Sequence, residues 1–310
     1  LCLARYLKRD DFLLSLCFGM VLISQTAYII SLHPLTFQMI YPVAWGLPVC
    51  GLIYCYQIRN QITIRFSSVY KYSLLPYLLS VCFILASMGP PTMADALDYH
   101  LGIPVLMLRH QEWPATSLWL HSSLGGIGEM FYTLGMVLRA ENIGSILQAI
   151  GLVSFSIYLS KNLDLYKAIY LRLFVFSSPV LIFLVTGPKP QLFPEVMTAL
   201  ALQLTVTNKK IDKKTFVLIC VLIMGAAQQK LSFVLTGGVI GCWALWKALS
   251  HSRMAIIFGL ISFIYFFVPR GLWNLQQLTE YSLIGFFTPL PESVIDKIGA
   301  YRENQWWFPI

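Results

Sequence analysis

The chain has 310 residues, of which 57% are hydrophobic and only 12% are charged, and its mean hydropathy is +0.68. Soluble domains carry about 25% charged residues, so this composition excludes an ordinary soluble domain. The formal net charge of +8 is then expected to mark cytoplasmic loops through the positive-inside rule, rather than a nucleic-acid-binding surface. The seven cysteines form no CxxC pair and no Cys/His metal spacing, and we expect most of them to be small buried side chains.

Two apolar segments open the chain. Residues 12–32 and residues 35–57 each reach the length of about 20 residues that a transmembrane helix needs. The first is too long for the apolar core of a signal peptide and has no small-residue cleavage site. A link with three basic residues follows, which favours a cytoplasmic position. We therefore expect residues 1–72 to hold two extra N-terminal transmembrane segments and a cytoplasmic link.

A third apolar segment, residues 73–88, is expected to cross outward and to end at Gly89-Pro90-Pro91. The loop that follows, from 89 to about 122, contains one Arg and no Lys, which supports an external position. Within six residues this loop carries two carboxylates, a phenol and an imidazole. These groups belong to Asp95, Asp98, Tyr99 and His100.

The spacing of these groups predicts a short helix from residue 95 to about 110, which lies along the membrane surface and is interrupted near Pro104. Asp95, Asp98 and Tyr99 would share one face of this helix, and we expect Asp95 to face a cavity. The apolar positions on the other face are Leu97, Leu101, Val105 and Leu108. The alternative interpretation is a solvated loop helix without a chemical role.

The region from 123 to 207 contains four apolar runs. An odd number of membrane crossings is needed here, because the region leads from the external loop at 89–122 to a cytoplasmic loop. Residues 208–214 are assigned to the cytoplasm because they carry four lysines. One run therefore does not span the membrane, and we expect it to be 123–138 or 143–160, because both are short and closely spaced. Later crossings are expected at 215–231, 233–250 and 254–268, with 270–310 outside.

This topology brings carboxylates and cations to one external face. The residues concerned are Asp95, Asp98, Tyr99, His100, Lys189, Lys230, Arg270 and Asn274. Charged groups at membrane depth are costly and usually functional. Two alternatives without a chemical role stay open: Lys230 could be a snorkelling lysine, and Arg270 could be an interfacial anchor. A phosphate-bearing substrate would suit the set, because Lys and Arg donate charge-assisted hydrogen bonds to phosphate and a carboxylate activates an attacking hydroxyl.

The stretch Asp95-Ala96-Leu97-Asp98-Tyr99-His100-Leu101 has the pattern Asp-x-x-x-Tyr-His-Leu, and further motifs follow it. These are Gly125 to Tyr132, Ser177-Ser178-Pro179, Gly187-Pro188-Lys189-Pro190, Gly225 to Lys230, Arg270 to Asn274 and Phe286 to Pro291. In order and spacing they resemble GT-C fold membrane glycosyltransferases, the superfamily of protein O-mannosyltransferases and of ArnT-like and RgtA/B/C/D-like enzymes. The chain departs from that pattern at Ser122-Ser123, where a Pro-Pro pair is usual, and at Gln191 and Glu195, where an Asp is frequent.

The resemblance implies an all-α, polytopic transmembrane fold of the GT-C type with external juxtamembrane helices, in which residues 73–310 form the catalytic module. It implies transfer of a hexose or pentose from a polyprenyl-phosphate-linked donor to a lipid, glycan or protein acceptor on the non-cytoplasmic face, with inversion at the anomeric carbon. It also implies a multi-pass protein of the bacterial inner (plasma) membrane that binds no nucleic acid. The chain begins at Leu1 and stops in mid-loop, so we expect a longer protein with a further C-terminal part.

Transferred residue by residue, the resemblance makes Asp95 the catalytic base and Asp98 a supporting carboxylate. The implied substrate-binding residues are Tyr99, His100, Lys189, Lys230, Arg270 and Asn274. The cations would hold the phosphate and stabilise the leaving group, and we expect Asp95 to share one cavity with Lys230 and Arg270. Some relatives use Mg²⁺ or Mn²⁺, for which Asp95, Asp98 and His100 offer hard ligands. Octahedral sites draw on several loops, so no metal site is predicted.

Two other classes of protein stay open. A transporter or flippase of lipid-linked sugars would also place cations at membrane depth, but it should show internal repeats, and the sequence shows none. A structural membrane subunit is the third class. It does not explain why carboxylates and cations fall on the same face.

Overall fold

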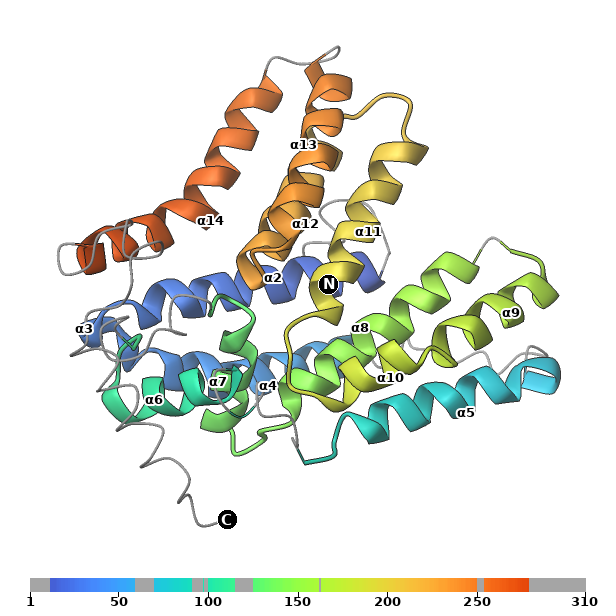
Figure 1. Cartoon of the computed structure of the whole chain (residues 1–310), viewed down its shortest axis with the longest axis horizontal. Helices are drawn as coiled ribbons and strands as arrows, with labels where there is room; N and C mark the ends of the chain where they lie inside the picture. Colours follow the sequence, from blue (N-terminus) through green and yellow to red (C-terminus); the bar gives the residue numbers. More distant parts are fainter. Residues whose placement is uncertain are drawn as a thin grey trace, which may run out of the picture.

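The computed structural model describes residues 12–58, 70–90, 97, 100–114, 125–161, 163–249 and 254–278. Within these residues every regular element is a helix, as the apolar runs predict (Figure 1). The helices are α2 (Phe12–Ser31), α3 (Pro34–Phe37), α4 (Ile40–Ile58), α5 (Tyr70–Ala86), α6 (Gly102–His110), α7 (Glu129–Val137), α8 (Ile143–Ser160), α9 (Leu165–Phe176), α10 (Pro179–Thr186), α11 (Leu192–Thr207), α12 (Lys213–Gln229), α13 (Phe233–Leu249) and α14 (Met254–Leu278).

Three helical stretches of the described residues are long and apolar enough to cross a membrane. They are Leu13–Ser31, Pro34–Ile53 and Ile143–Ser160. A fourth crossing results if α9 and α10 form one span, because this apolar pair is bent by 58° at a short break. The break has a local cause: the Ser178 side chain accepts a hydrogen bond from the Leu181 N–H, and Pro179 occupies the first turn of α10. These features indicate a membrane protein.

The uneven lengths of α7 and α8 decide which run between 123 and 160 is too short to span. α7 has nine residues and α8 has 18. At about 1.5 Å per residue, α7 is roughly 14 Å long, about half the hydrocarbon thickness of a bilayer. Its residues Glu129 to Gly135 are all buried, and a Cβ on Gly144 of α8 would lie 2.5 Å from the Tyr132 ring. α7 is therefore an interior helix packed closely on α8.

α11, α12, α13 and α14 form one group of helices that run alternately up and down (Figure 1). α12 is central to this group, because 13 of its 17 residues are buried and it contacts α11, α13, α14 and α2. Its first turn is capped by Asp212, whose carboxylate accepts from the Thr215 N–H at 3.0 Å. One end of the group carries the connection 208–212, and the other carries the turn 230–232 and the start of α11. The two ends are about 25 Å apart along α12.

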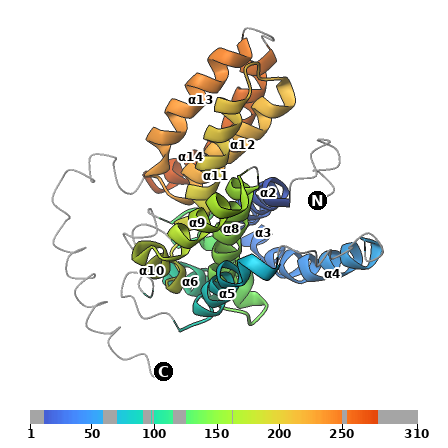
Figure 2. The same cartoon turned by 90° about the vertical axis from the view of Figure 1, so that its right-hand side faces the viewer.

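The two N-terminal helices are placed differently from each other. α2 is part of the core: a Cβ on Gly225 of α12 would lie 2.6 Å from Val21, and Gln25 Nε2 donates to the Tyr265 carbonyl of α14 at 2.8 Å. α4 instead extends away from the other helices (Figure 2), and only 17% of the candidate span that contains most of it is buried. The exposed side chains of α4 are largely apolar, as lipid contact requires.

The helix that contains the crossing predicted at 254–268 continues beyond that range, while its apolar part is Met254–Pro269. α14 continues through Pro269 to Leu278 and changes direction in its second half (Figure 1). Proline removes one backbone donor and clashes with the preceding turn, so it bends a helix without necessarily ending it. Arg270 therefore lies within a helix and not after one.

The surface helix predicted from 95 to about 110 is described in part, since Leu97 and His100 have π-helical backbone and α6 covers Gly102–His110. α6 starts at Gly102, so Pro104 lies in its first turn, where the missing N–H has no intrahelical partner to lose. The predicted interruption near Pro104 corresponds to the turn at Leu101, between the π-helical His100 and the start of α6. Residues 95, 96, 98 and 99 lie outside the described part of the chain. The predicted outer face is partly confirmed, because Leu97 and Val105 are exposed, while Ile103 and Met107 on the other side of α6 are fully buried.

Candidate functional site

Lys230 ends α12 and is held by a side chain from another helix. Its backbone N–H donates to the Ala226 carbonyl at 3.0 Å, which closes the last turn of α12. Its Nζ donates to Gln191 Oε1, at the start of α11, across 3.0 Å. A charged donor makes a stronger hydrogen bond than a neutral one. The contact therefore fixes the ammonium group where α11 begins and α12 ends.

Gln148 of α8 organises the same place from a third helix. Its Oε1 accepts from the N–H groups of Gln191 at 3.0 Å and Leu192 at 3.1 Å, so it caps the start of α11. Its Nε2 donates to the Tyr132 hydroxyl oxygen at 2.7 Å. Burial raises the pKa of Tyr132, so the phenol stays neutral and able to accept this bond. A continuous chain of hydrogen bonds thus joins Lys230, Gln191, Gln148 and Tyr132.

A buried pair, His100 and Glu129, lies at the start of α7. His100 Nδ1 lies 2.8 Å from Glu129 Oε1, and both side chains are at most 4% exposed. The Gly126 N–H donates to Glu129 Oε2 at 2.6 Å. Glu129 occupies the first turn of α7, where the helix dipole favours negative charge. A carboxylate oxygen accepts, so Nδ1 of His100 carries the proton, and the pair ties the end of the Asp95–His100 stretch to α7.

The Lys230 contact and the His100–Glu129 pair belong to segments that touch. The Ile127 N–H donates to the Gln228 carbonyl at 3.2 Å, which joins the start of α7 to the end of α12. A Cβ on Gly128 would clash with the Pro190 ring and lie 3.5 Å from the Gln229 carbonyl. Glycine is therefore required at 128. The approach it permits brings residues 126–129, 187–191 and 228–230 to one place.

Two neighbouring amides at this place lack partners among the described residues. Gln228 Oε1, Gln229 Oε1 and Gln229 Nε2 are buried without a hydrogen bond there, and both side chains are 2% exposed. An unpaired buried polar atom costs about 1–3 kcal/mol. Such atoms in a native protein call for an explanation, such as a bound polar molecule. Two of the three atoms are acceptors and one is a donor, so directly before Lys230 they indicate a site for a polar molecule with hydroxyl groups.

The opposite end of the α11–α14 group carries most of the positive charge. Lys209, Lys210, Lys213 and Lys214 are exposed there. Lys247 donates to the Thr205 and Asn208 carbonyls at 2.7 and 3.2 Å, and so caps the end of α11. The candidate site and the lysine cluster therefore lie at opposite ends of the same helices.

The sequence-predicted residues fall into two groups. His100, Lys189 and Lys230 are described, and Lys189 is half-buried in the turn before α11. Asp95, Asp98 and Tyr99 lie outside the described residues, and so do Ser122, Ser123 and the segment 286–291. The backbone of Arg270 and Asn274 belongs to α14, but their side chains are outside the described part of the structure. A shared cavity for Asp95, Lys230 and Arg270 therefore stays a prediction.

Sequence reasoning missed Glu129, Gln148, Gln228 and Gln229 as site residues. Glu129 could have been identified from the sequence, because it is a single acidic residue in an apolar segment, where charged residues are usually functional. The glutamines carried a weaker one, since amides in apolar runs are common. Gln191 was noted only as a departure from a family pattern, and the structure makes it the partner of Lys230. Within the described residues no three His, Cys, Asp or Glu side chains group as metal ligands.

Comparison with known proteins gives one match. The family model described as the DUF1420 N-terminal domain matches residues 52–303, which is more than half of the chain and includes every site residue named above. No curated protein matches the chain, and no solved structure matches it either.

Proposed function

The chain belongs to the DUF1420 N-terminal domain family, and we propose that it is a membrane glycosyltransferase that moves a sugar from a polyprenyl-phosphate-linked donor to a lipid, glycan or protein acceptor. The observation that carries the proposal is the contact between Lys230 and Gln191 beside the buried amides of Gln228 and Gln229. Gln191 positions the ammonium group without adding a negative charge itself, and the half-buried Glu195 carboxyl lies near enough to interact with the same ammonium group. Gln229 Nε2 is a donor that a phosphate oxygen could accept from, and the Oε1 atoms of Gln228 and Gln229 are acceptors for sugar hydroxyls.

In the proposed reaction the bond between the anomeric carbon and the phosphate oxygen breaks, and the bond between that carbon and the acceptor oxygen forms. The hydroxyl proton of the acceptor passes to the carboxylate of Asp95, the base that the resemblance implies. The electron pair of the broken bond stays on the polyprenyl phosphate. Lys230 stabilises that leaving group, together with Arg270 if both cations face it.

His100 and Glu129 have a positioning role in this proposal. Their hydrogen bond joins α7 to the residue directly after Tyr99, and so restrains the end of the stretch that carries Asp95 and Asp98. A general base must lie within about 3 Å of the proton that it removes. A buried pair that restrains the chain five residues away helps to satisfy that demand.

The positive-inside rule assigns the side of the membrane. Lys209, Lys210, Lys213 and Lys214 favour the cytoplasm for their end of α11 and α12. Lys230 ends α12 on the other side, about 25 Å away along the helix. We therefore place transfer on the non-cytoplasmic face, where polyprenyl-linked sugars would be used.

A membrane assay tests the proposal. Membranes that contain the protein receive a polyprenyl-phosphate donor with an isotopic label in its sugar, and the label is followed by extraction and mass spectrometry. We expect label to appear in a new lipid, glycan or protein fraction, and not in membranes that contain the Lys230→Gln variant. Full retention of the label on the polyprenyl phosphate in membranes with the wild-type protein contradicts transfer.

A further inference from the structure

A side chain of α2 contacts the bend of α14. Pro269 has no N–H, so the carbonyl four residues earlier, that of Tyr265, loses the donor that a regular α-helix would provide. Gln25 Nε2 donates to this Tyr265 carbonyl at 2.8 Å, and it lies 3.5 Å from the Phe266 carbonyl. The donor that the proline removes from α14 is therefore supplied by α2.

The contact lies in apolar surroundings. Gln25 and Phe266 are both fully buried, and the bend closes the apolar stretch Met254–Pro269. A backbone carbonyl without a donor is costly in such surroundings, and membrane helices tolerate proline where neighbouring groups satisfy the freed carbonyl. The next residue of α2 adds a second contact, since the Thr26 and Tyr265 hydroxyl oxygens are 3.3 Å apart. One short stretch of α2 thus makes both contacts.

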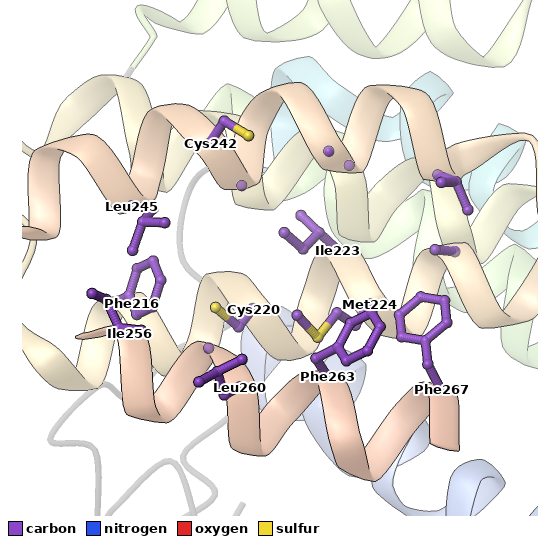
Figure 3. A pocket seen from close by; sticks show the side chains of 16 residues that line it. Phe216, Cys220, Ile223, Met224, Cys242, Leu245, Ile256, Leu260, Phe263 and Phe267 are labelled. Carbon is purple, nitrogen blue, oxygen red and sulfur yellow. The ribbon is translucent and has the colours of Figure 1, made fainter. Parts of the chain in front are cut away.

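The two halves of α14 differ in how they are held. Figure 3 shows Phe263 and Phe267, in the first half, beside an apolar pocket that α12 and α13 also line. Gly271 and Leu272, which follow Pro269, are exposed. Among the described residues, the first half is therefore fixed by packing, and the bend decides where the second half points.

We propose that Gln25 is a positioning residue: it holds the bend of α14 by replacing the donor that Pro269 lacks, and so directs the segment that begins at Arg270. The inference rests in part on the proposed function, in which Arg270 faces the donor phosphate, whereas the role of Gln25 in the bend does not depend on it. The family match covers residues 52–303, so all of α2 lies before it. The N-terminal helix thus shapes the site without carrying a site residue.

A double-mutant cycle on the full-length chain, followed by equilibrium unfolding in detergent micelles, tests the bond itself. Gln25→Met keeps the length of the side chain and removes the donor, whereas Pro269→Ala returns an N–H that can donate to the Tyr265 carbonyl. We expect Gln25→Met to lower the folding equilibrium constant about tenfold, and to change it much less when Pro269→Ala is present. Gln203→Met, at an amide outside this contact, should have equal effects in both backgrounds.

The outcome of the cycle separates a hydrogen bond from simple packing. An equal loss from Gln25→Met in both backgrounds overturns the proposal, because the side chain would then only fill space. If Gln25→Met alone does not fold, the double variant decides. A folded double variant supports the proposal, and an unfolded one beside a folded Pro269→Ala protein overturns it.

Pulsed electron paramagnetic resonance tests the bend in a background without native cysteines. Spin labels at Ile257 and Leu272, exposed positions on either side of Pro269, would be about 22 Å apart along a straight helix. We expect a shorter, narrow distance distribution in the wild type, a longer distance in Pro269→Ala, and a broadened distribution in Gln25→Met that Gln203→Met does not show. A Gln25→Met distribution identical to that of the wild type overturns the proposal.

Binding of a polyprenyl-phosphate sugar tests the consequence for Arg270. We expect Gln25→Met and Arg270→Gln each to raise the donor Kd about fivefold or more. Arg270→Gln should raise it much less in the Gln25→Met protein, because the two changes act on one contact. Unchanged donor binding beside a broadened distance distribution leaves the role of Gln25 in the bend intact and removes Arg270 from the proposed donor site.

Discussion

Lys230 Nζ and Gln191 Oε1 are 3.0 Å apart, although 39 residues separate them in the chain. This contact joins the end of α12 to the start of α11 and places an ammonium group at the end of the helices that is remote from the lysine cluster at 209–214. A hydrogen bond to a charged group contributes about 1.5–3 kcal/mol. The contact is therefore both a structural link and the anchor of the proposed phosphate site.

Gln191→Leu removes this link while keeping the side-chain volume. We expect the free energy of unfolding to fall by roughly 1.5–3 kcal/mol, because Lys230 loses its neutral partner, and the isoprenyl-phosphate Kd to rise because the ammonium group is no longer positioned. Thermal unfolding measures the loss of stability, and binding of an isoprenyl monophosphate measures the change in Kd. Gln203→Leu is the matched control, since Gln203 Oε1 has no hydrogen-bond partner among the described residues. Equal results for the two variants would show that the contact is unimportant.

Gln148→Leu should be more damaging than Gln191→Leu. It removes three hydrogen bonds, and it leaves the Gln191 and Leu192 N–H groups and the Tyr132 hydroxyl without this partner. At about 1 kcal/mol per bond the loss is roughly 3 kcal/mol or more. A shift of the unfolding midpoint no larger than that of Gln203→Leu contradicts the proposed organising role of Gln148.

Glu129→Leu leaves His100 buried without its carboxylate. Removal of one member of a buried pair destabilises proteins by about 3–5 kcal/mol, so we expect poor folding yield and a lower unfolding midpoint. Glu129→Gln keeps the shape and one hydrogen bond, and should fold while reducing transfer. Glu141→Gln, at an exposed acid, serves as the control and should stay within about 0.5 kcal/mol of the wild type. Full transfer activity in Glu129→Gln rules out a positioning role.

The sequence predicts the helices well because their lengths follow from apolar runs between charged or proline-rich breaks. It could not choose between the runs at 123–138 and 143–160, because both are apolar and only packing buries α7 on all sides. It placed a helix end at Pro269, whereas α14 continues to Leu278, because a proline within a helix bends it without always ending it. The hydrogen-bond partners of Lys230 and His100 could not be predicted from the sequence, because contacts across 39 and 29 residues depend on how the helices pack together.

The topology can be checked by cysteine labelling in a background without native cysteines. Ser232, in the exposed turn after Lys230, should react from the non-cytoplasmic side. Ser117 and Ser293, which the sequence assigns to external segments, should react from the same side. A cysteine at Lys209 should react only from the cytoplasm. Labelling of Ser117 and Ser232 from opposite sides contradicts a shared face for the Asp95 loop and Lys230.

Asp95→Asn should separate chemistry from binding. The amide keeps the shape of the carboxylate but cannot accept the acceptor proton, so transfer should fall by about 100-fold or more while the isoprenyl-phosphate Kd changes little. Lys230→Ala should instead raise that Kd. Near wild-type transfer by Asp95→Asn would assign the base to another group.

The most direct test of the central claim is the mass balance of the reaction with purified protein in liposomes. Mass spectrometry follows a polyprenyl-phosphate sugar, the released polyprenyl phosphate and the glycosylated acceptor from a membrane extract. A glycosyltransferase releases one carrier phosphate for each sugar that appears on the acceptor, and this release should be strongly reduced in Lys230→Gln. Movement of the intact donor across the bilayer, with no released carrier and no glycosylated acceptor, would contradict transfer and identify a transporter.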